Sequence, residues 1–392
     1  MSIDQKESVE KEELVVGTID LVLADIIIDL AALEPEKAAE LQALVGRFTH
    51  KRGDKVRVEK DIFEEVLVPA IDNVPVSITP GGSSANALST ANLLMANNNL
   101  STHYLGFISP GGLYSSMIAR GFREARIELF PKMPAPAGIE TAVSFVFVYP
   151  DRQRNIITYP GNADQFMTPE MVTEAFMDGC DTFFMQGSAW KKFDHRVADK
   201  MYHMAVERGK DITLALPTNA FSPEEKDTRA RVLFDEALHT ARFVVGNEDE
   251  VRRMFKLNAT LGIGQAAKEL QRQFREQRDA TGIEREAMIT SGSRGAMIIT
   301  ADRLEHVKAV KLSSEDLKKG STLGAGDATI GFRLAAHFAG MESRAATEFA
   351  MKGGAECCKV LGARIPNPRE RLKTLLPSAA EGLTLAAGGR GR

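Results

Sequence analysis

Short aliphatic and β-branched runs alternate along the chain with longer amphipathic stretches. Residues 15–29, rich in Val and Ile, predict one or two strands, residues 36–45 predict a helix, and residues 62–78 predict short strand-like pieces. The rhythm then becomes regular, with strands predicted at 182–185, 212–216, 243–245 and 287–290 and helices at 169–177, 194–208, 223–237, 248–255 and 263–275. This alternation implies right-handed βαβ units, a mostly parallel sheet and therefore an α/β fold.

The remaining predicted elements place clusters of glycine where one element ends and the next begins. A turn at residues 79–82 precedes a helix whose apolar stripe is Ala87, Leu88, Ala91, Leu94 and Met95. Further elements are a strand at 103–108, a helix at 111–122, paired strands at 142–148 and 155–159, and helices at 324–339 and 344–361. The 32 glycines of the chain are thus unevenly distributed, and three tight clusters need an explanation.

Composition, charge and cysteine content narrow the class of protein. A chain of 392 residues, 44% hydrophobic and 26% charged, is long enough to bury a core without disulfides. A net charge of −4 argues against nucleic-acid binding through a basic field, and three cysteines, two of them adjacent, match no disulfide or zinc pattern. The polar first thirteen residues do not resemble a secretory leader, and three aspartates within the apolar residues 14–33 argue against a membrane span. We therefore expect a cytoplasmic protein that binds neither nucleic acid nor membrane.

The glycine cluster at residues 320–332 (GSTLGAGDATIGF) carries the strongest chemical signal. Gly324, Ala325 and Gly326 are small residues just before an amphipathic helix, where backbone N–H groups and the helix dipole favour a bound anion. Asp327 follows in the first turn, where an ionised carboxylate is able to accept a proton from a substrate hydroxyl. Amide donors beside a base are what phosphoryl transfer to an alcohol requires. Taken alone, a glycine-rich turn with an acidic helix-start residue explains the segment at least as well.

Two further clusters each have a functional and a structural interpretation. Gly81 and Gly82 open a predicted helix, and Asn86, one turn in, carries an amide that suits a polyol; a turn with a helix cap explains these residues equally well. Residues 290–295 (TSGSRG) form either a hairpin turn or a nucleotide-contacting loop at a strand end. The chain has no GxxxxGK[ST], HExxH or GxSxG sequence, which argues against a Walker-type loop, a zinc protease and a hydrolase elbow.

In this order, the clusters resemble the motifs of the PfkB family of carbohydrate and nucleoside kinases, which has the ribokinase-like fold. The late family motif D-T-x-G-A-G-D is matched by residues 321–327 (STLGAGD), and the Gly-Gly pair followed by a helical Asn is matched by residues 81–86. The N-x-x-E motif is matched by residues 247–250, and T-x-G-x-x-G by residues 290–295. Four ordered motifs are more specific than any one of them, and the resemblance covers about residues 14–376.

The resemblance implies the architecture of the chain. We expect a ribokinase-like three-layer α/β/α core with a mostly parallel sheet and a small β lid, all within a kinase domain at residues 14–376. The lid would be formed by about residues 25–75 and 137–160, and flexible tails would occupy residues 1–13 and 377–392. Exposed lid strands in this family often pair between subunits, so the resemblance also allows a homodimer formed through the lid.

The resemblance further implies a role for each matching residue. Asp327 is similar in position to the catalytic base, and the amides of Gly324, Ala325 and Gly326 to the anion hole for the transferring phosphoryl group. The residues implied for ATP and Mg²⁺ are Asn247, Glu250, Thr290, Gly292 and Gly295, with Glu250 holding Mg²⁺ through water. The residues implied for the substrate are Asp25, or in its place Asp20, together with Gly81, Gly82 and Asn86.

The implied reaction is ATP-dependent phosphorylation of the primary hydroxyl of a ribose-type substrate. Residues 141–162, with a P-D-x-x-R turn before a T-Y-x-G stretch, and the NEDE of residues 247–250 favour the adenosine and inosine-guanosine kinase branch, and hence a purine nucleoside. The alternative is a sugar kinase acting on ribose, fructose or a related acid. Ser321 stands where the family motif begins with Asp, which puts activation by K⁺ in doubt and motivates a second alternative, a catalytically weak member that binds its ligand.

Overall fold

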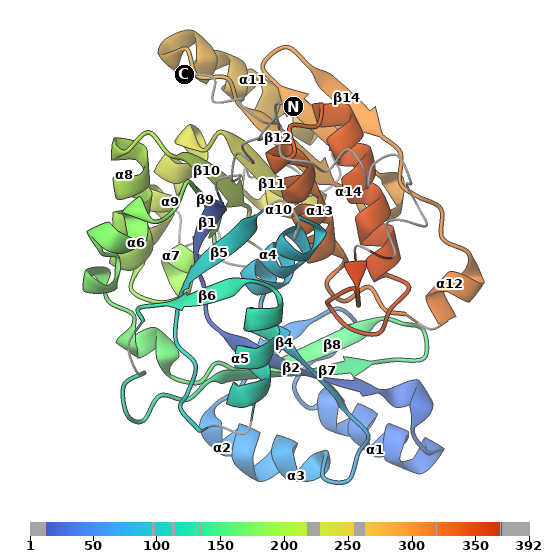
Figure 1. Ribbon diagram of the computed structural model, residues 1–392. Helices are drawn as coiled ribbons and strands as arrows, with labels where there is room; N and C mark the ends of the chain where they lie inside the picture. The colour runs from blue at the N-terminus through green and yellow to red at the C-terminus, as the bar shows by residue number, and fades with distance from the viewer. Residues whose placement is uncertain are drawn as a thin grey trace, which may run out of the picture.

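The computed structural model describes residues 13–95, 99–111, 114–132, 135–217, 228–254, 263–318, 320–368 and 370, and its strands form two sheets (Figure 1). The strands are β1 (Leu14–Ile19), β2 (Leu23–Asp29), β3 (Lys55–Arg57), β4 (Ser77–Gly81), β5 (Leu100–Leu105), β6 (Ile127–Phe130), β7 (Ala142–Val148), β8 (Arg154–Tyr159), β9 (Thr182–Gln186), β10 (Asp211–Ala215), β11 (Phe243–Asn247), β12 (Glu286–Thr290), β13 (Ala296–Thr300) and β14 (Leu304–Val307). The large sheet has the order β14-β13-β12-β11-β10-β9-β1-β5-β6, and the small sheet the order β3-β8-β7-β2-β4.

Helices connect these strands and cover both sheets. The α-helices are α1 (Pro35–Gly46), α2 (Lys60–Ile62), α3 (Val68–Ala70), α4 (Ser83–Leu94), α5 (Ser115–Glu124), α6 (Glu174–Asp178), α7 (Ala189–Lys192), α8 (His195–Glu207), α9 (Arg229–Thr240), α10 (Glu248–Met254), α11 (Ile263–Thr281), α12 (Ser314–Lys318), α13 (Ala325–Phe338) and α14 (Ser343–Cys357). Single helical turns of other kinds are η1 (Leu30–Ala32), the π-helical η2 (Phe63–Leu67), η4 (Ala163–Phe166), η5 (Pro169–Met171) and η7 (Gly292–Arg294).

The large sheet lies between two helical layers, which confirms the three-layer α/β/α core predicted from the sequence. Its strands are continuous apolar runs because both faces are buried. In β9, for example, Phe183 and Met185 join the core beneath α6, α8, α9 and α11, whereas Phe184 joins the core beneath α4, α13 and α14. In Figure 1, α6, α8 and α9 lie on one side of the sheet and α13 and α14 on the other.

The large sheet is parallel from β6 to β12, as the strand–helix alternation predicted. Beyond β12 the pairing is antiparallel, because β13 runs opposite to β12 and β14 runs opposite to β13, and these two strands extend the sheet as a meander. The strand order reverses direction at β1, which pairs with β5 on one side and with β9 on the other. In open α/β sheets ligands bind outside the carboxyl ends of the strands near such a reversal.

The small sheet stands beside the carboxyl end of β1, because the chain passes from β1 directly into β2. One face packs on α1, η2 and the turns around them. On the other face Ile27, Val146 and Ile156 contact Leu323 and Ala363 of the large unit. This second contact fixes the small sheet over the end of the large one.

The prediction of strand-like pieces at residues 62–78 was wrong. The segment is helical from α2 through η2 to α3, and a strand forms only at β4. Ile62, Phe63 and Leu67 pack on the small sheet at helical spacing, and the Phe63 ring stacks on Tyr159 at 4.7 Å between centroids. Tertiary packing thus overrides the β-propensity of these side chains.

The turn predicted at residues 79–82 was also wrong, because β4 extends to Gly81 and pairs with β2, so the chain turns only at Gly82. The remaining predicted elements agree with the structure apart from their bounds. The helix expected at 169–177 is divided into η5 and α6, and the one expected at 223–237 is described only from residue 229, because residues 218–227 lie outside the described part of the chain. Apart from residue 13, the two expected tails also lie outside the described residues.

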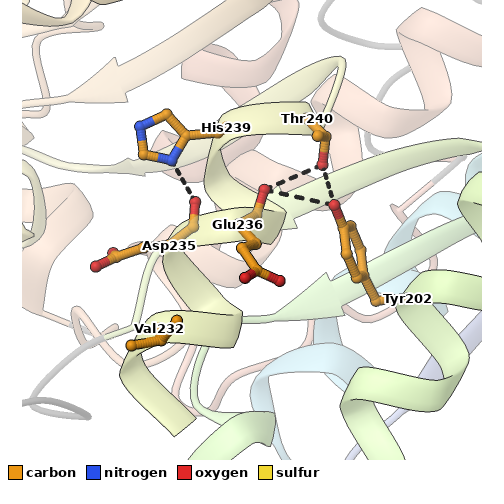
Figure 2. A pocket seen from close by; sticks show the side chains of 6 residues that line it. All are labelled: Tyr202, Val232, Asp235, Glu236, His239 and Thr240. Carbon is orange, nitrogen blue, oxygen red and sulfur yellow. Dashed lines mark hydrogen bonds between the residues drawn. The ribbon is translucent and has the colours of Figure 1, made fainter. Parts of the chain in front are cut away.

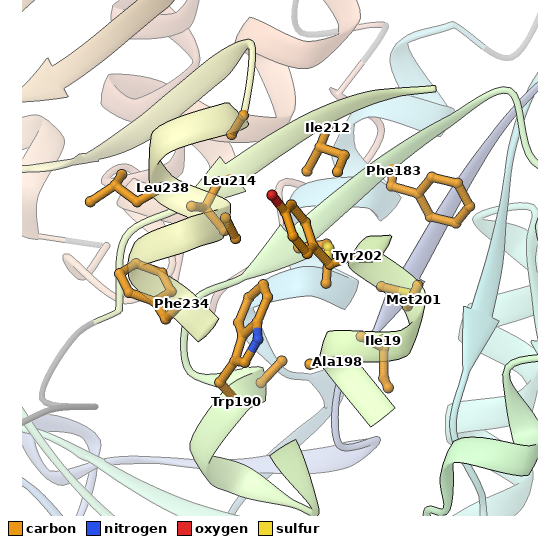
Figure 3. Close-up of a cluster of buried hydrophobic side chains, with 14 of the residues drawn as sticks. Ile19, Phe183, Trp190, Ala198, Met201, Tyr202, Ile212, Leu214, Phe234 and Leu238 are labelled. Carbon is orange, nitrogen blue, oxygen red and sulfur yellow. The ribbon is translucent and has the colours of Figure 1, made fainter. Parts of the chain in front are cut away.

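The single tryptophan of the chain serves packing. Trp190 on α7 is buried and meets Phe234 of α9 edge-to-face, with 5.7 Å between ring centroids, in the apolar cluster that Figure 3 shows.

Among the described helices, none combines the length and the apolar character that crossing a bilayer requires.

Candidate active site

A cleft of about 740 Å³ lies where the small sheet faces the carboxyl ends of the large sheet. Its floor contains the ends of β9, β10, β11 and β12, through Gln186, Leu216, Asn247 and Thr290. Of the residues predicted for function, those that line the cleft are Asp25, Gly82, Asn86, Asn247, Glu250, Thr290, Gly324, Gly326 and Asp327. Segments spread over most of the chain therefore meet in one cavity.

Helices α4 and α13 present their first turns to this cleft. They approach so closely that a Cβ added to Gly331 would lie 2.4 Å from the carbonyl oxygen of Ala87. This packing brings Asn86 of α4 to Asp327 of α13, and the Asn86 Nδ2 donates a hydrogen bond of 3.2 Å to Oδ2 of Asp327. A small residue at position 331 is thus what allows the amide and the carboxylate to meet.

The groups around the Asp327 carboxyl affect its pKa in opposite directions. Burial raises its pKa, while hydrogen bonds from Asn86 and Ser83 and the positive charges of Lys55 and Arg154 lower it. Burial outweighs these groups, so the pKa of Asp327 is raised above its ordinary value, as suits a carboxyl that accepts a proton.

Asp25 is a second carboxyl in the cleft and is more buried than Asp327. It lies on β2, 7% exposed, and burial followed by repulsion from Asp327 raises its pKa to about 7. Gly81 of the neighbouring strand β4 leaves room for it, since an added Cβ would lie 2.4 Å from the Asp25 Cγ. Gly81 itself does not line the cleft, so its observed role is to accommodate Asp25.

The alternative aspartate, Asp20, has a different environment. It is 1% exposed and does not line the cleft. The Lys192 ammonium donates to its Oδ1 at 2.7 Å, and the Ser84 hydroxyl donates to its Oδ2 at 3.0 Å. Asp20 therefore ties the β1–β2 junction to α4 and α7 through a buried ion pair.

The loop before α13 has the geometry of an anion-binding turn. Gly324 is the N-cap of α13 with φ of +71°, a left-handed conformation that favours glycine. Gly324 and Gly326 line the cleft, while Ala325, the first residue of the helix, does not. The N–H groups of the first turn of an α-helix have no partner within the helix and attract negative charge.

Ser321, where the family motif begins with Asp, is buried behind this loop. Its Oγ accepts a hydrogen bond of 3.3 Å from the N–H of Leu323. Its own N–H donates to the carbonyl of Val360. A neutral hydroxyl thus accepts the hydrogen bond of the turn's Leu323 N–H at this position.

Asn247 and Glu250 form a reciprocal capping box where β11 passes into α10. The Asn247 Oδ1 accepts a hydrogen bond of 2.9 Å from the Glu250 N–H, and the Glu250 Oε2 accepts one of 2.8 Å from the Asn247 N–H. Both residues line the cleft. The predicted N-x-x-E motif therefore has an observed structural role as a helix cap. Its role in binding metal stays a prediction, and it would use the same two side chains.

The oxygen donors at the β11 end of the cleft bear on whether a magnesium ion fits there. Within the described ranges, no three His, Cys, Asp or Glu side chains converge as metal ligands. Glu250 is the single carboxylate at the β11 end of the cleft lining. Because Mg²⁺ is commonly bound by one or two carboxylates, water and substrate phosphates, this donor set fits an ion that arrives with a nucleotide.

Of the three residues predicted for the nucleotide loop, one lines the cleft and two lie outside its lining. Thr290, at the end of β12, lines the cleft and donates a hydrogen bond of 3.3 Å from Oγ1 to the Gly246 carbonyl. Gly292 and Gly295 lie beyond it in the turn that joins β12 to antiparallel β13, and they do not line the cleft. The hairpin interpretation of residues 290–295 is thus confirmed, and contact of this turn with a nucleotide stays a prediction.

Three basic residues near the two carboxyls were not predicted. Arg154 on β8 donates a hydrogen bond of 2.7 Å from Nη1 to Thr322 Oγ1, in the loop before α13. Lys55 on the edge strand β3 also lines the cleft, and Arg364 behind it donates a hydrogen bond of 3.0 Å from Nε to Asn86 Oδ1. Only Arg154 had a sequence signal, as the last residue of the P-D-x-x-R turn; Lys55 and Arg364 lie outside every motif.

A second hollow, of about 530 Å³, lies between α8 and α9 and contains none of the predicted residues (Figure 2). Its polar groups are engaged with helix α9 itself. Tyr202 Oη lies 2.5 Å from Thr240 Oγ1, and His239 Nδ1 lies 2.5 Å from the Asp235 carbonyl. The predicted residues gather in the first cleft, which is therefore the candidate active site.

Comparison with known proteins identifies the same family that the sequence motifs resemble. The chain matches the model of the pfkB family of carbohydrate kinases over residues 58–370. No curated protein matches it.

Several solved structures share the fold. An adenosine kinase from Sinorhizobium meliloti is 18% identical with a TM-score of 0.72, covering 93% of this chain and 100% of its own. An adenosine kinase from Schistosoma mansoni in complex with 2-fluoroadenosine is 16% identical with a TM-score of 0.72, covering 91% and 98%. A probable sugar kinase from Rhizobium etli is 16% identical with a TM-score of 0.70, covering 93% and 98%. At these identities the similarity shows the fold alone, which is the predicted ribokinase-like fold.

Proposed function

The chain belongs to the pfkB family of carbohydrate kinases, ATP-dependent enzymes that phosphorylate a hydroxyl group, and we propose that its acceptor is the primary hydroxyl of a purine nucleoside. The observation that carries the proposal is the position of Asp327, which lies in the first turn of α13 and lines the cleft. There its half-buried carboxyl lies beside the amides of a helix N-terminus whose N-cap, Gly324, has a positive φ.

In the proposed reaction Asp327 is the general base. Its carboxylate accepts the proton of the acceptor hydroxyl while that oxygen forms a bond to the γ-phosphorus of ATP. The bond from this phosphorus to the β,γ-bridging oxygen breaks, and ADP leaves with the electron pair. The amides of Gly324, Ala325 and Gly326 would stabilise the charge on the transferring phosphoryl group.

The donor nucleotide is proposed to lie along the ends of β11 and β12. Thr290 and the turn containing Gly292 and Gly295 follow β12, while Asn247 and Glu250 follow β11. Glu250 would hold Mg²⁺ through water, and the ion would supply positive charge to the phosphates. The cleft lining places both strand ends in the same cavity as Asp327, which supports this orientation.

The acceptor is proposed to occupy the end of the cleft under the small sheet, which we propose acts as its lid. Asp25 and Asn86 lie there, next to Gly82, and carboxylate and amide groups suit the paired hydroxyls of a ribose. The share of adenosine kinases among the similar solved structures favours a nucleoside.

One observation favours the second candidate, a kinase for a sugar or a sugar acid. The described lining of the cleft contains no Phe, Tyr or Trp on which a purine would stack. It does contain Lys55, Arg57 and Arg154 on the small sheet, three cations that suit an anionic substituent. A sugar acid therefore belongs in any test of the acceptor.

A substrate panel tests the proposal. ADP formation is measured with adenosine, inosine, guanosine, ribose, fructose and gluconate, and the phosphorylated position is assigned by ³¹P NMR. Phosphorylation of a nucleoside at its primary hydroxyl is the expected result. Exclusive turnover of a sugar or of gluconate would replace the nucleoside by the second candidate. Calorimetric binding of ATP and a nucleoside without ADP formation would identify a ligand-binding member instead.

The same panel, run in K⁺ and in Na⁺, tests the cation dependence. A hydroxyl at position 321 provides no negative charge for a monovalent cation, so we expect turnover to be equal in the two salts. Activation of severalfold by K⁺ would show that another group holds the ion.

The oligomeric state is a separate part of the proposal. The small sheet has two edges, β3 and β4, and an unpaired edge strand is able to add a strand from a second copy. We propose a homodimer formed through this sheet. Light scattering after size-exclusion chromatography is expected to give about twice the chain mass, and a monomer mass at micromolar concentration would contradict it.

A further inference from the structure

Arg364 lies behind the wall of the cleft, after the end of α14, in a segment that none of the sequence motifs includes. Its neighbour Ala363 lines the cleft, whereas Arg364 does not. Its Nε donates a hydrogen bond of 3.0 Å to Oδ1 of Asn86. Its Nη2 is buried and, among the described residues, has no hydrogen-bond partner.

The contact decides which way the Asn86 amide faces. A guanidinium has only donors, so the amide atom turned toward it must be the oxygen. The amide nitrogen then faces the opposite way, toward Asp327, and donates the hydrogen bond of 3.2 Å to its Oδ2. A flipped amide would place its oxygen against the carboxylate, where the two acceptors repel.

The guanidinium also places a positive charge near the two carboxyls, with a stronger effect on Asp25 than on Asp327. It attracts Asp25 and Asp327, and although burial lowers the Arg364 pKa to about 10, the group stays protonated at neutral pH. It lowers the pKa of Asp25, against burial and against the repulsion from Asp327. The other charged groups that act on this pair come from the small sheet, Lys55 and Arg154, with Lys192 of α7 near Lys55.

We propose that Arg364 is a positioning residue for phosphoryl transfer: it fixes the Asn86 amide so that its NH₂ group faces Asp327, and it supplies the buried positive charge beside the two carboxyls. The inference rests on the proposed function of Asp327 as the base. It adds that the C-terminal segment after α14 controls the orientation and the ionisation of the base without touching the substrate.

Three substitutions separate the two roles of Arg364. Arg364→Gln keeps an NH₂ donor for Asn86 but removes the charge, Arg364→Lys keeps the charge but loses the planar donor, and Arg364→Met removes both. We expect Arg364→Met to lower kcat by about tenfold to a hundredfold with the KM for ATP within twofold of the parent. We expect Arg364→Gln to move the acidic limb of the kcat–pH profile upward by about one pH unit, and Arg364→Lys to leave that limb in place.

A buried arginine remote from the cleft serves as the matched control. Arg285 donates from Nε to the Ala241 carbonyl at 2.8 Å and does not line the cleft. Arg285→Gln is expected to lower the thermal midpoint while leaving the pH profile unchanged. A shift seen with Arg364→Gln and absent with Arg285→Gln therefore reports position and charge rather than general loss of stability.

A second readout keeps this inference separate from the proposed function. The carboxyl carbons of Asp25 and Asp327 are titrated by ¹³C NMR in the full-length protein, parent and Arg364→Gln, without substrate. Upward movement of both midpoints supports the positioning role even if the substrate panel gives no ADP, which would overturn only the proposed function. Unchanged midpoints in Arg364→Gln, or an Arg364→Met protein that is folded and has parental kcat and pH profile, would overturn the inference.

Discussion

Asn86 Nδ2 and Asp327 Oδ2 lie 3.2 Å apart although 241 positions separate the two residues along the chain. The hydrogen bond joins the first turns of α4 and α13, two helices of the same layer. It therefore connects the residue proposed to bind the acceptor with the residue proposed to deprotonate it. Four predictions concern this pair and the groups that hold it in place.

Asp327→Asn is expected to lower kcat by at least two orders of magnitude, because an amide does not accept the proton of the acceptor hydroxyl. Folding should be little affected, since the substitution is isosteric and removes a carboxyl whose charged form is disfavoured at this site. Asp279→Asn, at an exposed carboxyl on α11, is the control and should match the parent. ADP formation by Asp327→Asn near the parental rate would refute the proposed mechanism.

Asp25→Asn is expected to change how stability depends on pH. The folded-state pKa of Asp25 is raised to about 7 from an ordinary 3.8, so between these values the folded state holds a proton that the unfolded state releases. The contribution of this group to stability therefore falls as pH rises through that window, by up to about 4 kcal/mol. An Asn in place of Asp25 stays neutral and removes this loss.

Urea denaturation at pH 5 and pH 8 measures the effect. The free energy of unfolding of Asp25→Asn relative to the parent should increase between the two pH values. If the two proteins kept a constant difference, Asp25 would be ionised in the folded state throughout the range.

Arg154→Met is expected to lower kcat by at least tenfold. Arg154 lines the cleft, bonds to Thr322 in the loop before α13 and acts electrostatically on Asp327, so its positive charge lies near the proposed site of phosphoryl transfer. Arg154→Lys should recover part of the loss because it restores the charge. Arg152→Met, in the same turn but paired with Asp29 at 3.0 Å, is the control. Equal losses in Arg152→Met and Arg154→Met would point to a general effect on the turn.

Gly331→Ala is expected to destabilise the protein by about 1–3 kcal/mol, because the new methyl group would meet the Ala87 carbonyl at 2.4 Å and force α4 and α13 apart. The same movement would lengthen the contact between Asn86 and Asp327, so kcat should fall as well. Gly46→Ala in α1 adds a methyl group in open space and should leave kcat unchanged. Chemical denaturation and steady-state kinetics on the two variants give the comparison, and a Gly331→Ala protein as stable and active as the parent would contradict this account of the helix contact.

The sequence by itself determined the fold class, the family and the residues of the cleft that belong to recognisable motifs. Strand–helix alternation predicts a parallel sheet because each βαβ unit is formed by neighbouring segments of the chain. The helix N-terminus at Gly324 and Asp327 is predictable from sequence because capping and the helix dipole act within one turn. It did not predict the helical packing of residues 62–70, where contact with the small sheet overrides strand propensity.

Tertiary structure alone decided which polar side chains meet. Both aspartates at the start of the chain fit the motif, and only the fold distinguishes Asp25, which faces the cleft with a raised pKa, from Asp20, which is paired with Lys192. Arg364 and Lys55 lie in no motif, and their positions beside the carboxyls arise from packing between segments far apart in the chain. Local patterns record what a residue does within its own helix or strand, whereas burial and electrostatic coupling depend on what the rest of the chain places against it.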